Sequence, residues 1–216
     1  MPNIKDIQFS EVKQGRSQQT LDDLMEAAFA IVEGADPDAF TSRALSKKSG
    51  YALGTLHKRL ASIENVFLWA IQEGHKKQLE KLCRITLEHD ENKPVLDLIE
   101  HMVDASFAAI QQVSPKVIRF FENRFMRKNG LPPDFFGYLD ALASPYIQAA
   151  QKDKTGTFRV MTENELRLTL RSMLMLVERP FVDGDVIAGT PEHRAIAIEN
   201  LMRLLGSNDR KEPPTF

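Results

Sequence analysis

The chain has 216 residues, with one cysteine, one tryptophan and a formal net charge of only −2. The single Cys83 excludes an internal disulfide and a zinc site built from cysteines, and it is consistent with a reducing compartment. No apolar run approaches the ~20 residues of a membrane-spanning helix, so we expect no membrane partner. Lys5, Asp6, Glu11 and Lys13 near the N-terminus predict that there is no signal peptide. We therefore expect a cytoplasmic protein.

The sequence also lacks the short motifs of common enzyme classes. It contains no G-x-S-x-G, no H-E-x-x-H, no P-loop and no G-x-G-x-x-G. His89-Asp90-Glu91 predicts a polar helix end better than a metal site. Asp183-Gly184-Asp185 resembles part of a calcium loop but lacks the other ligands at the required spacing. We expect no enzyme, no metal and no cofactor; a small enzyme using a C-terminal cavity is an alternative that no motif supports.

Helical periodicity and helix-ending residues recur along the chain, whereas strand signals are scarce. We predict an all-α fold of about nine helices, over residues 17–33, 41–48, 52–60, 63–88, 93–113, 115–130, 131–154, 162–182 and 190–206. Thr20 and Asp23 could form a capping box if the first helix begins there, and Thr162 with Glu165 forms another. Pro145 should kink or split the helix that contains it.

A basic cluster occupies residues 41–60. This stretch reads TSRALSKKSGYALGTLHKRL and holds five Lys or Arg, one His and no Asp or Glu. Residues 1–62 carry eight basic and eight acidic side chains, and all the acids lie before Phe40. Two short helical patterns meet at Ser49-Gly50, where glycine permits a turn with positive φ. A turn-separated helix pair with a cationic surface is typical of proteins that insert a helix into the DNA major groove.

Small, apolar and turn residues follow one ordered pattern from Leu21 to Phe67. The pattern consists of Ala27-Ala28, Gly34, Thr41, Leu45-Ser46, Ser49-Gly50, Ala52-Leu53-Gly54-Thr55-Leu56-His57, Leu60, Ser62-Ile63 and Val66. It resembles the helix-turn-helix of the TetR family of bacterial transcriptional regulators, without a gap from Thr41 to Val66. The resemblance covers about a quarter of the chain, and the later helices match that family only in number and length.

The resemblance implies a three-helix, helix-turn-helix DNA-binding head over residues 1–65. It implies a larger C-terminal helical domain for effector binding and dimerisation over residues 66–216. Leu53, Gly54 and Thr55 would lie over base edges, where Leu and the Thr methyl can contact thymine methyls and Gly54 allows close approach. Arg43 could reach guanine or phosphate. The other predicted DNA-binding residues position the head on phosphates: Thr41, His57, Lys58, Arg59 and Ser62.

Four positions depart from the family pattern, and one of them, Leu60 in place of an aromatic residue, is a tolerable core substitution. The family's capping serine before the recognition helix is Ala52 here, its phosphate-contacting tyrosine is His57, and the lysine that opens its fourth helix is Ile63. Lys58 and Arg59 can offset these lost contacts. The alternative is a ligand- or protein-binding module of the same fold with weakened or lost DNA binding, whose basic cluster is only a solvated face.

Aromatic residues concentrate between residues 120 and 136. The resemblance implies a pocket for a small apolar or amphipathic effector, to which methionine adapts well. Its predicted lining is Phe120, Phe121, Phe125, Phe136 and Met173. Ordinary core packing is an equally good interpretation of each phenylalanine alone.

Two C-terminal helices carry broad apolar surfaces. Their stripes are Leu166, Leu170, Met173, Leu174 and Val177, and Ile198, Leu201, Met202 and Leu205. A single stripe normally packs within its own chain, but Met175, Leu176 and Ile196 extend the apolar surface. The resemblance then implies a homodimer through the last two helices, with two heads on a palindromic double-stranded operator. The sequence therefore predicts a ligand-responsive transcriptional regulator, a repressor by family habit.

Overall fold

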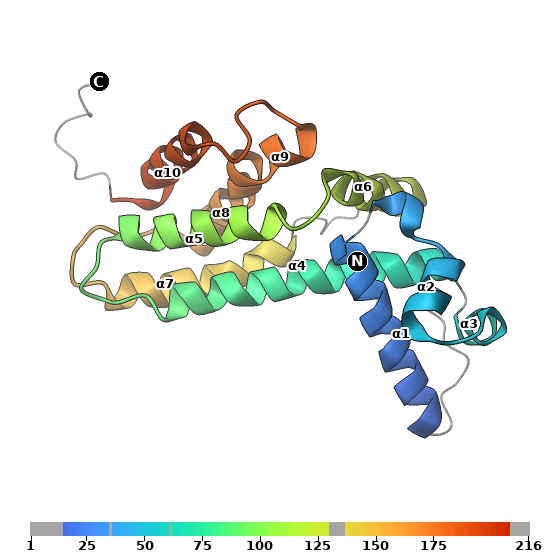
Figure 1. Cartoon of the computed structure of the whole chain (residues 1–216). Coiled ribbons are helices and arrows are strands. Elements are labelled where there is room, and N and C mark those ends of the chain that lie inside the picture. The colour runs from blue at the N-terminus through green and yellow to red at the C-terminus, as the bar shows by residue number, and fades with distance from the viewer. Residues whose placement is uncertain (1–14, 35, 61, 130–136, 208–216) are drawn as a thin grey trace. The chain divides into compact units, whose positions relative to one another are not determined.

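Helices make up most of the described chain. The computed structural model describes residues 15–34, 36–60, 62–129 and 137–207, and this part holds ten α-helices and two 3-10 helices (Figure 1). Over these residues there is no strand, and the one β-type pairing is an isolated bridge between Phe158 and Gly206. None of the described helices combines the length and the apolar character needed to cross a bilayer. The all-α prediction is confirmed.

The chain divides into two compact units. Unit 1 comprises the residues up to Lys77 and Gln112–Phe135, and unit 2 comprises Gln78–Gln111 and the residues from Phe136 onward. The long helix α4 (Ile63–Leu87) runs through the first boundary. The functional division at residues 65 and 66 remains a prediction.

Unit 1 is built on α1 (Gly15–Gly34), η2 (Pro37–Ala39), α2 (Ser42–Ser49), α3 (Leu53–Arg59), the first part of α4 and α6 (Pro115–Asn129). Its core includes the fully buried Leu24, Ala28, Leu45, Leu56, Val66, Phe67 and Val117. Helix α1 includes the residues before Thr20, so the condition for a capping box with Asp23 is not met. Inside the helix, Gln19 instead donates a hydrogen bond to the Asp23 carboxylate at 2.7 Å.

Unit 2 is built on α5 (Val95–Ile110), η3 (Gly137–Leu142), α7 (Ala143–Lys152), α8 (Glu163–Val177), α9 (Arg179–Asp183) and α10 (Pro191–Leu205), with the last part of α4. Helix α10 packs on α5 and α8. The core includes the buried Val95, Leu98, Ile99, Leu142, Leu166, Leu170, Ala197, Leu201 and Leu205. The apolar stripes predicted on α8 and α10 therefore fill this core.

Prolines explain where helix boundaries differ from the prediction. Helix α5 begins at Val95 rather than near residue 93, because Lys93 precedes Pro94 and the helical conformation is disfavoured there. The predicted split at Pro145 lies just before it: η3 ends at Leu142, and Pro145 sits in the first turn of α7, where no helical N–H is needed. The start predicted at residues 131–133 and the end at Gly130 lie outside the described residues.

The helix expected over residues 162–182 is two helices, α8 and α9. Pro180 has no N–H to donate to the carbonyl of Leu176, which would be its partner in a continuous helix. The Nε2 of His193 in α10 lies 2.8 Å from that carbonyl, while its Nδ1 accepts the Gly189 N–H at 3.1 Å. The carbonyl can only accept, so Nε2 carries the ring proton. The buried His193 of α10 therefore donates to the Leu176 carbonyl the hydrogen bond that Pro180 cannot supply.

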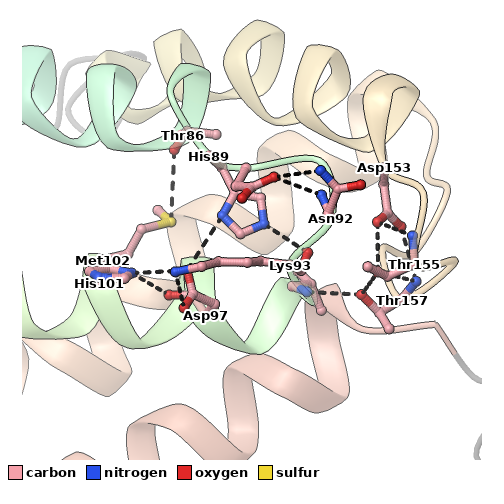
Figure 2. A network of polar contacts seen from close by, with 12 residues as sticks. Thr86, His89, Asn92, Lys93, Asp97, His101, Met102, Asp153, Thr155 and Thr157 are labelled. Atoms are coloured by element: carbon pink, nitrogen blue, oxygen red, sulfur yellow. Dashed lines mark hydrogen bonds and ion pairs between the residues drawn. The ribbon is translucent and has the colours of Figure 1, made fainter.

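A polar network joins the α4–α5 and α7–α8 loops of unit 2 (Figure 2). The Thr157 hydroxyl accepts the Val95 N–H at 2.8 Å and so caps α5 from another loop. The Asp153 carboxylate in turn accepts the Thr157 N–H at 3.0 Å, which holds this loop in place. In the loop after α4, His89 Nε2 is 3.1 Å from the Lys93 carbonyl oxygen. The network thus supplies an acceptor for the Val95 N–H at the start of α5, where the preceding Pro94 has no side-chain acceptor.

Candidate nucleic-acid interface

Helix α2 begins and ends as the local sequence predicts. The Thr41 side chain accepts the Ala44 N–H at 3.1 Å, which is an N-cap. Gly50 ends the helix at φ 78°, a left-handed conformation that favours glycine, and its N–H donates to Ser46 O at 3.0 Å. Leu45 is fully buried and fixes the inward face of α2. These two local signals therefore position the outward face, which carries Arg43.

The turn between α2 and α3 is held by side chains on both sides. The Ser46 hydroxyl donates to the Tyr51 carbonyl at 2.6 Å, and the Ser49 hydroxyl donates to the Leu45 carbonyl at 2.7 Å. The Tyr51 hydroxyl donates to the Asp23 carboxylate of α1 at 2.6 Å. This hydrogen bond, with that from Gln19, holds the pKa of Asp23 below its ordinary value, and it raises the pKa of Tyr51. The hydrogen bond from Tyr51 to Asp23 therefore fixes the turn between α2 and α3 against α1.

Helix α3 buries one side and exposes the other. Leu56 and Leu60 are buried in the unit 1 core, so the positions between them face outward. Ala52 precedes the helix and provides no side-chain cap. Leu53 is 39% exposed although it is a large apolar residue, and Gly54 is exposed beside it. The exposed first turn of α3 therefore has mainly apolar and backbone surface.

Basic residues cluster on these two helices, whose own sequences contain no Asp or Glu. Neither α2 nor α3 has an acidic residue in its first turn, and the last turns carry Lys47, Lys48, His57, Lys58 and Arg59. All of these except the half-buried Arg59 are exposed, as is Arg43. The basic residues in the last turns also interact favourably with the helix dipoles. The local field is positive although the chain as a whole carries −2.

All nine predicted DNA-binding residues lie in unit 1; eight are on α2, on α3 or next to them, and Ser62 directly precedes α4. Six are exposed: Thr41, Arg43, Leu53, Gly54, His57 and Lys58. Thr55, Arg59 and Ser62 are half-buried, and the Ser62 hydroxyl accepts the Asn65 N–H at 3.3 Å at the start of α4. Their contact with DNA remains a prediction.

Helix α6 also belongs to unit 1, and it contacts the segment before Thr41 that leads into α2. The Asp36 carboxylate accepts hydrogen bonds from Lys116 and from the Ser114 hydroxyl, each at 2.7 Å, and these contacts lower the Asp36 pKa. Phe40 stacks on Phe67 with ring centroids 4.7 Å apart and meets Phe120 edge-on at 5.5 Å. The loop before Thr41 is therefore held at both ends. We call the two hydrogen bonds from Ser114 and Lys116 to Asp36 the clasp. The sequence did not predict it, because the bonded residues are 78 and 80 positions apart.

The residues predicted to line an effector pocket lie in different units. Phe121 is buried in unit 1, where its ring meets His75 edge-on at 5.5 Å, and Phe120 packs on the same core. Met173 packs on the unit 2 core. The Phe125 side chain and Phe136 lie outside the described residues. Core packing accounts for Phe121, and the pocket itself remains a prediction.

The described residues contain no group of three His, Cys, Asp or Glu side chains placed to hold a metal ion. The histidine at the end of α4 belongs to the polar network of Figure 2, where His89 Nδ1 is 3.8 Å from Asp97 and His101 Nδ1 is 3.4 Å from the same carboxylate. Lys93 also contacts Asp97, at 3.1 Å, so its ammonium already neutralises this carboxylate.

Comparison with known proteins identifies the fold. Neither a family model nor a curated protein matches the sequence. A solved structure from Mesorhizobium loti, described as a TetR-family transcriptional regulator, is 14% identical and matches over 90% of this chain and 100% of its own, with a TM-score of 0.65. A TetR-family transcription regulator from Marinobacter aquaeolei is 14% identical over 89% of this chain and 98% of its own, with a TM-score of 0.52. The chain therefore has the fold of TetR-family transcriptional regulators.

Proposed function

We propose that the chain is a homodimeric DNA-binding transcriptional regulator whose affinity for its operator is controlled by a small molecule. The observation that carries this proposal is the helix pair α2–α3, which exposes Arg43, Lys47, Lys48 and Lys58 and contains no Asp or Glu in either helix. Its place in a fold that TetR-family regulators share supports the same function. Phosphate contacts from these cations would supply affinity, and α3 in the major groove would supply specificity.

Dimerisation through α8 and α10 is the second part of the proposal. Leu168 and Met175, seven residues apart on α8, are 68% and 55% exposed, and Ile196 on α10 is 39% exposed. Exposed large apolar residues on two helices that pack together suit a partner surface of the same composition. A two-fold axis through this surface would present two α3 helices to one face of a palindromic operator.

The effector is the third part of the proposal. We infer that this effector is a small apolar or amphipathic molecule bound in the C-terminal domain. In support, the indole N–H of Trp69 on α4 is buried and has no acceptor within the described chain. A buried donor without a partner is destabilising, and a bound molecule that accepts from it would remove that penalty. Effector binding would weaken operator binding by its preference for a second conformation. Repression as the direction of regulation rests on the resemblance to the TetR family alone.

A ligand- or protein-binding module without DNA recognition is the second candidate. Ala52 at the start of α3 favours it, because this position provides no capping hydrogen bond and no phosphate contact from a side chain. The two candidates make different predictions for substitutions of Arg43 and Lys58: only the DNA-binding regulator requires these side chains for its affinity for DNA.

The test begins with selection of bound fragments from genomic DNA, using the full-length protein, followed by titration of the selected fragment at several salt concentrations. We expect a palindromic site whose affinity falls steeply with salt. Arg43→Ala and Lys58→Ala should each weaken binding and reduce the salt slope by about two, because each removes one phosphate contact from both heads of the dimer. Lys152→Ala, an exposed lysine on α7, is the matched control and should change neither. No enriched fragment, or binding insensitive to both substitutions, favours the module.

Dimerisation has its own test. Leu168→Asp with Met175→Asp should convert a dimer to a monomer in sedimentation analysis, because two carboxylates cannot be buried in an apolar interface without partners. Leu87→Asp on α4, where the leucine is 43% exposed, is the matched control and should leave a dimer. A dimer that survives the double substitution would place the interface elsewhere.

A further inference from the structure

A buried histidine holds the start of α10. Among the described residues His193 is the one fully buried histidine, with 1% of its surface exposed. Its ring packs on Phe107 and Phe181, with centroid distances of 4.6 and 5.4 Å. Its Nδ1 accepts the Gly189 N–H at 3.1 Å, and its Nε2 donates to the Leu176 carbonyl at 2.8 Å. We call these two hydrogen bonds the His193 latch, which joins α10 to the end of α8 and to the α9–α10 loop.

The latch fits only the neutral imidazole. A neutral ring has one donor and one acceptor, which are the two functions used here, whereas an imidazolium has two donors. A second proton would leave the bond to Leu176 intact but place an N–H at Nδ1, opposite the Gly189 N–H at 3.1 Å. The two donors would then face each other without an acceptor, which is destabilising. The closed latch therefore excludes the second proton.

The α9–α10 loop has little room to adjust at Gly189. This glycine has φ 76°, and a Cβ built there would lie 3.0 Å from Gln111 Nε2 and 3.0 Å from Phe181 Cε1. One residue later, the Thr190 hydroxyl caps α10 by accepting the His193 N–H at 3.2 Å. Because these contacts fix the loop on both sides, a small shift cannot relieve the loss of the Gly189 hydrogen bond. The loop then has to leave its place against α5 and α9.

No carboxylate compensates an imidazolium at this position. Among the described residues no acidic group lies within ion-pair distance of the His193 ring. Burial raises the pKa of Glu178, at the α8–α9 break, to about 7, so this carboxyl loses its charge over the range in which a histidine gains one. The charged groups on the neighbouring elements have contacts of their own: Asp104 and Glu100 of α5 with Arg194, Arg179 with Asp183 on α9, Arg167 and Arg171 of α8 with Asp140, and Asp185 with the Ile187 N–H. Glu192 in the first turn of α10 is exposed.

We propose that the His193 latch is an acid-sensitive switch: one proton taken up by His193 releases the α9–α10 loop from α10, while the contact with α8 persists. An accessible imidazole takes up this proton near pH ~6.5. Since the open latch then binds one proton more than the closed latch, the ratio of open to closed rises by up to about tenfold for each pH unit below that value. Between pH 7.5 and pH 5 the open fraction should rise about 30-fold. The switch belongs to unit 2 alone and depends on neither DNA binding nor dimerisation.

Hydrogen exchange of the Gly189 amide tests the proposal in the full-length protein. Exchange would be followed by NMR between pH 7.5 and pH 5, and each rate corrected for the intrinsic amide exchange rate at that pH. We expect the protection of Gly189 to fall about 30-fold in wild type. His193→Gln, which supplies one donor and one acceptor but does not titrate, should keep this protection constant. His101→Gln removes a histidine of α5 whose side chain is 62% exposed, and as the matched control it should behave like wild type.

A second measurement on wild type keeps the test decisive if His193→Gln does not fold. Nitrogen-15 NMR of the labelled histidines reports which ring nitrogens carry protons. The proposal requires an unprotonated Nδ1 for as long as the Gly189 amide is protected. Three results would overturn it: protection of Gly189 that does not change with pH in wild type, equal losses in wild type and His193→Gln, or a doubly protonated His193 ring with Gly189 still protected.

Discussion

Replacing Gly54 by alanine should separate the stability of the fold from binding to DNA. The added methyl meets no atom of the chain within 4 Å, so no packing is lost. Alanine is favoured over glycine in a helix by up to about 1 kcal/mol, so the free energy of unfolding should rise or stay level. For a chain of 216 residues a gain of this size raises the melting temperature by about 2–4 °C.

The same methyl should weaken operator binding. If the α3 backbone lies against DNA at Gly54, an inserted methyl overpacks that contact, which costs about 1–3 kcal/mol. This corresponds to roughly 5- to 150-fold weaker binding. Thermal unfolding and fluorescence anisotropy on one preparation would measure both quantities. The expected result is two effects of opposite sign.

Two other glycines serve as controls. Gly34→Ala also adds a methyl that meets nothing within 4 Å, at the end of α1, and should leave DNA affinity unchanged. Gly50→Ala should destabilise the fold by about 1–2 kcal/mol, because alanine is strained at φ 78°. Wild-type operator affinity in Gly54→Ala would refute the reasoning, since the position would then need glycine neither for the fold nor for the partner.

Three further predictions concern unit 1. Thr41→Ala removes the acceptor of the Ala44 N–H and should lower the free energy of unfolding by about 1 kcal/mol in urea denaturation, whereas Thr41→Ser should not; equal stability of all three would contradict the cap. Tyr51→Phe should raise the Asp23 pKa toward 3.8 in an NMR titration. A carboxyl whose pKa is lower in the folded than in the unfolded state stabilises the fold at pH values above its unfolded-state pKa, and this stabilisation is lost as the pH falls through its folded-state pKa. Tyr51→Phe should therefore lose less stability than wild type on acidification, and a larger loss would contradict the assignment. Burial lowers the pKa of His75 from 6.5 to about 4, so the unfolded chain protonates first. Wild type should lose up to about 3 kcal/mol as the pH falls from 6.5 to 4, and His75→Phe should not; parallel losses in both would argue against burial as the cause.

Sequence reasoning succeeded where the determining interactions are local. Helix α2 begins at its cap Thr41 and ends at its cap Gly50 through hydrogen bonds that span at most four residues, and Thr190 caps α10 in the same way. The types and positions of these residues were therefore sufficient to predict the helix ends. The prediction failed at Pro180 although its signal was local as well. The apolar periodicity through Val182 outweighed a proline that cannot supply a helical hydrogen bond, and a strict application of that rule would have divided the helix.

Contacts between distant residues could not be predicted in the same way. The hydrogen bond from Tyr51 to Asp23 spans 28 residues, and the clasp on Asp36 spans about 80, yet each partner alone looks like an ordinary surface residue. Apolar periodicity also identifies a buried face without saying which core receives it. From the sequence, Phe121 could line an effector pocket or pack in a core, and the structure buries it in the core of unit 1.

The hydrogen bond at the α8–α9 break has a consequence for synthesis of the chain. The Leu176 carbonyl accepts its hydrogen bond from His193, 17 residues later in the chain. A nascent chain that ends between these two residues therefore cannot form this bond at the α8–α9 break. A truncation that removes α10 would expose this carbonyl together with the rings of Phe107 and Phe181, which pack on His193 at 4.6 and 5.4 Å. Unit 2 thus becomes a finished structure only when its last helix has left the ribosome.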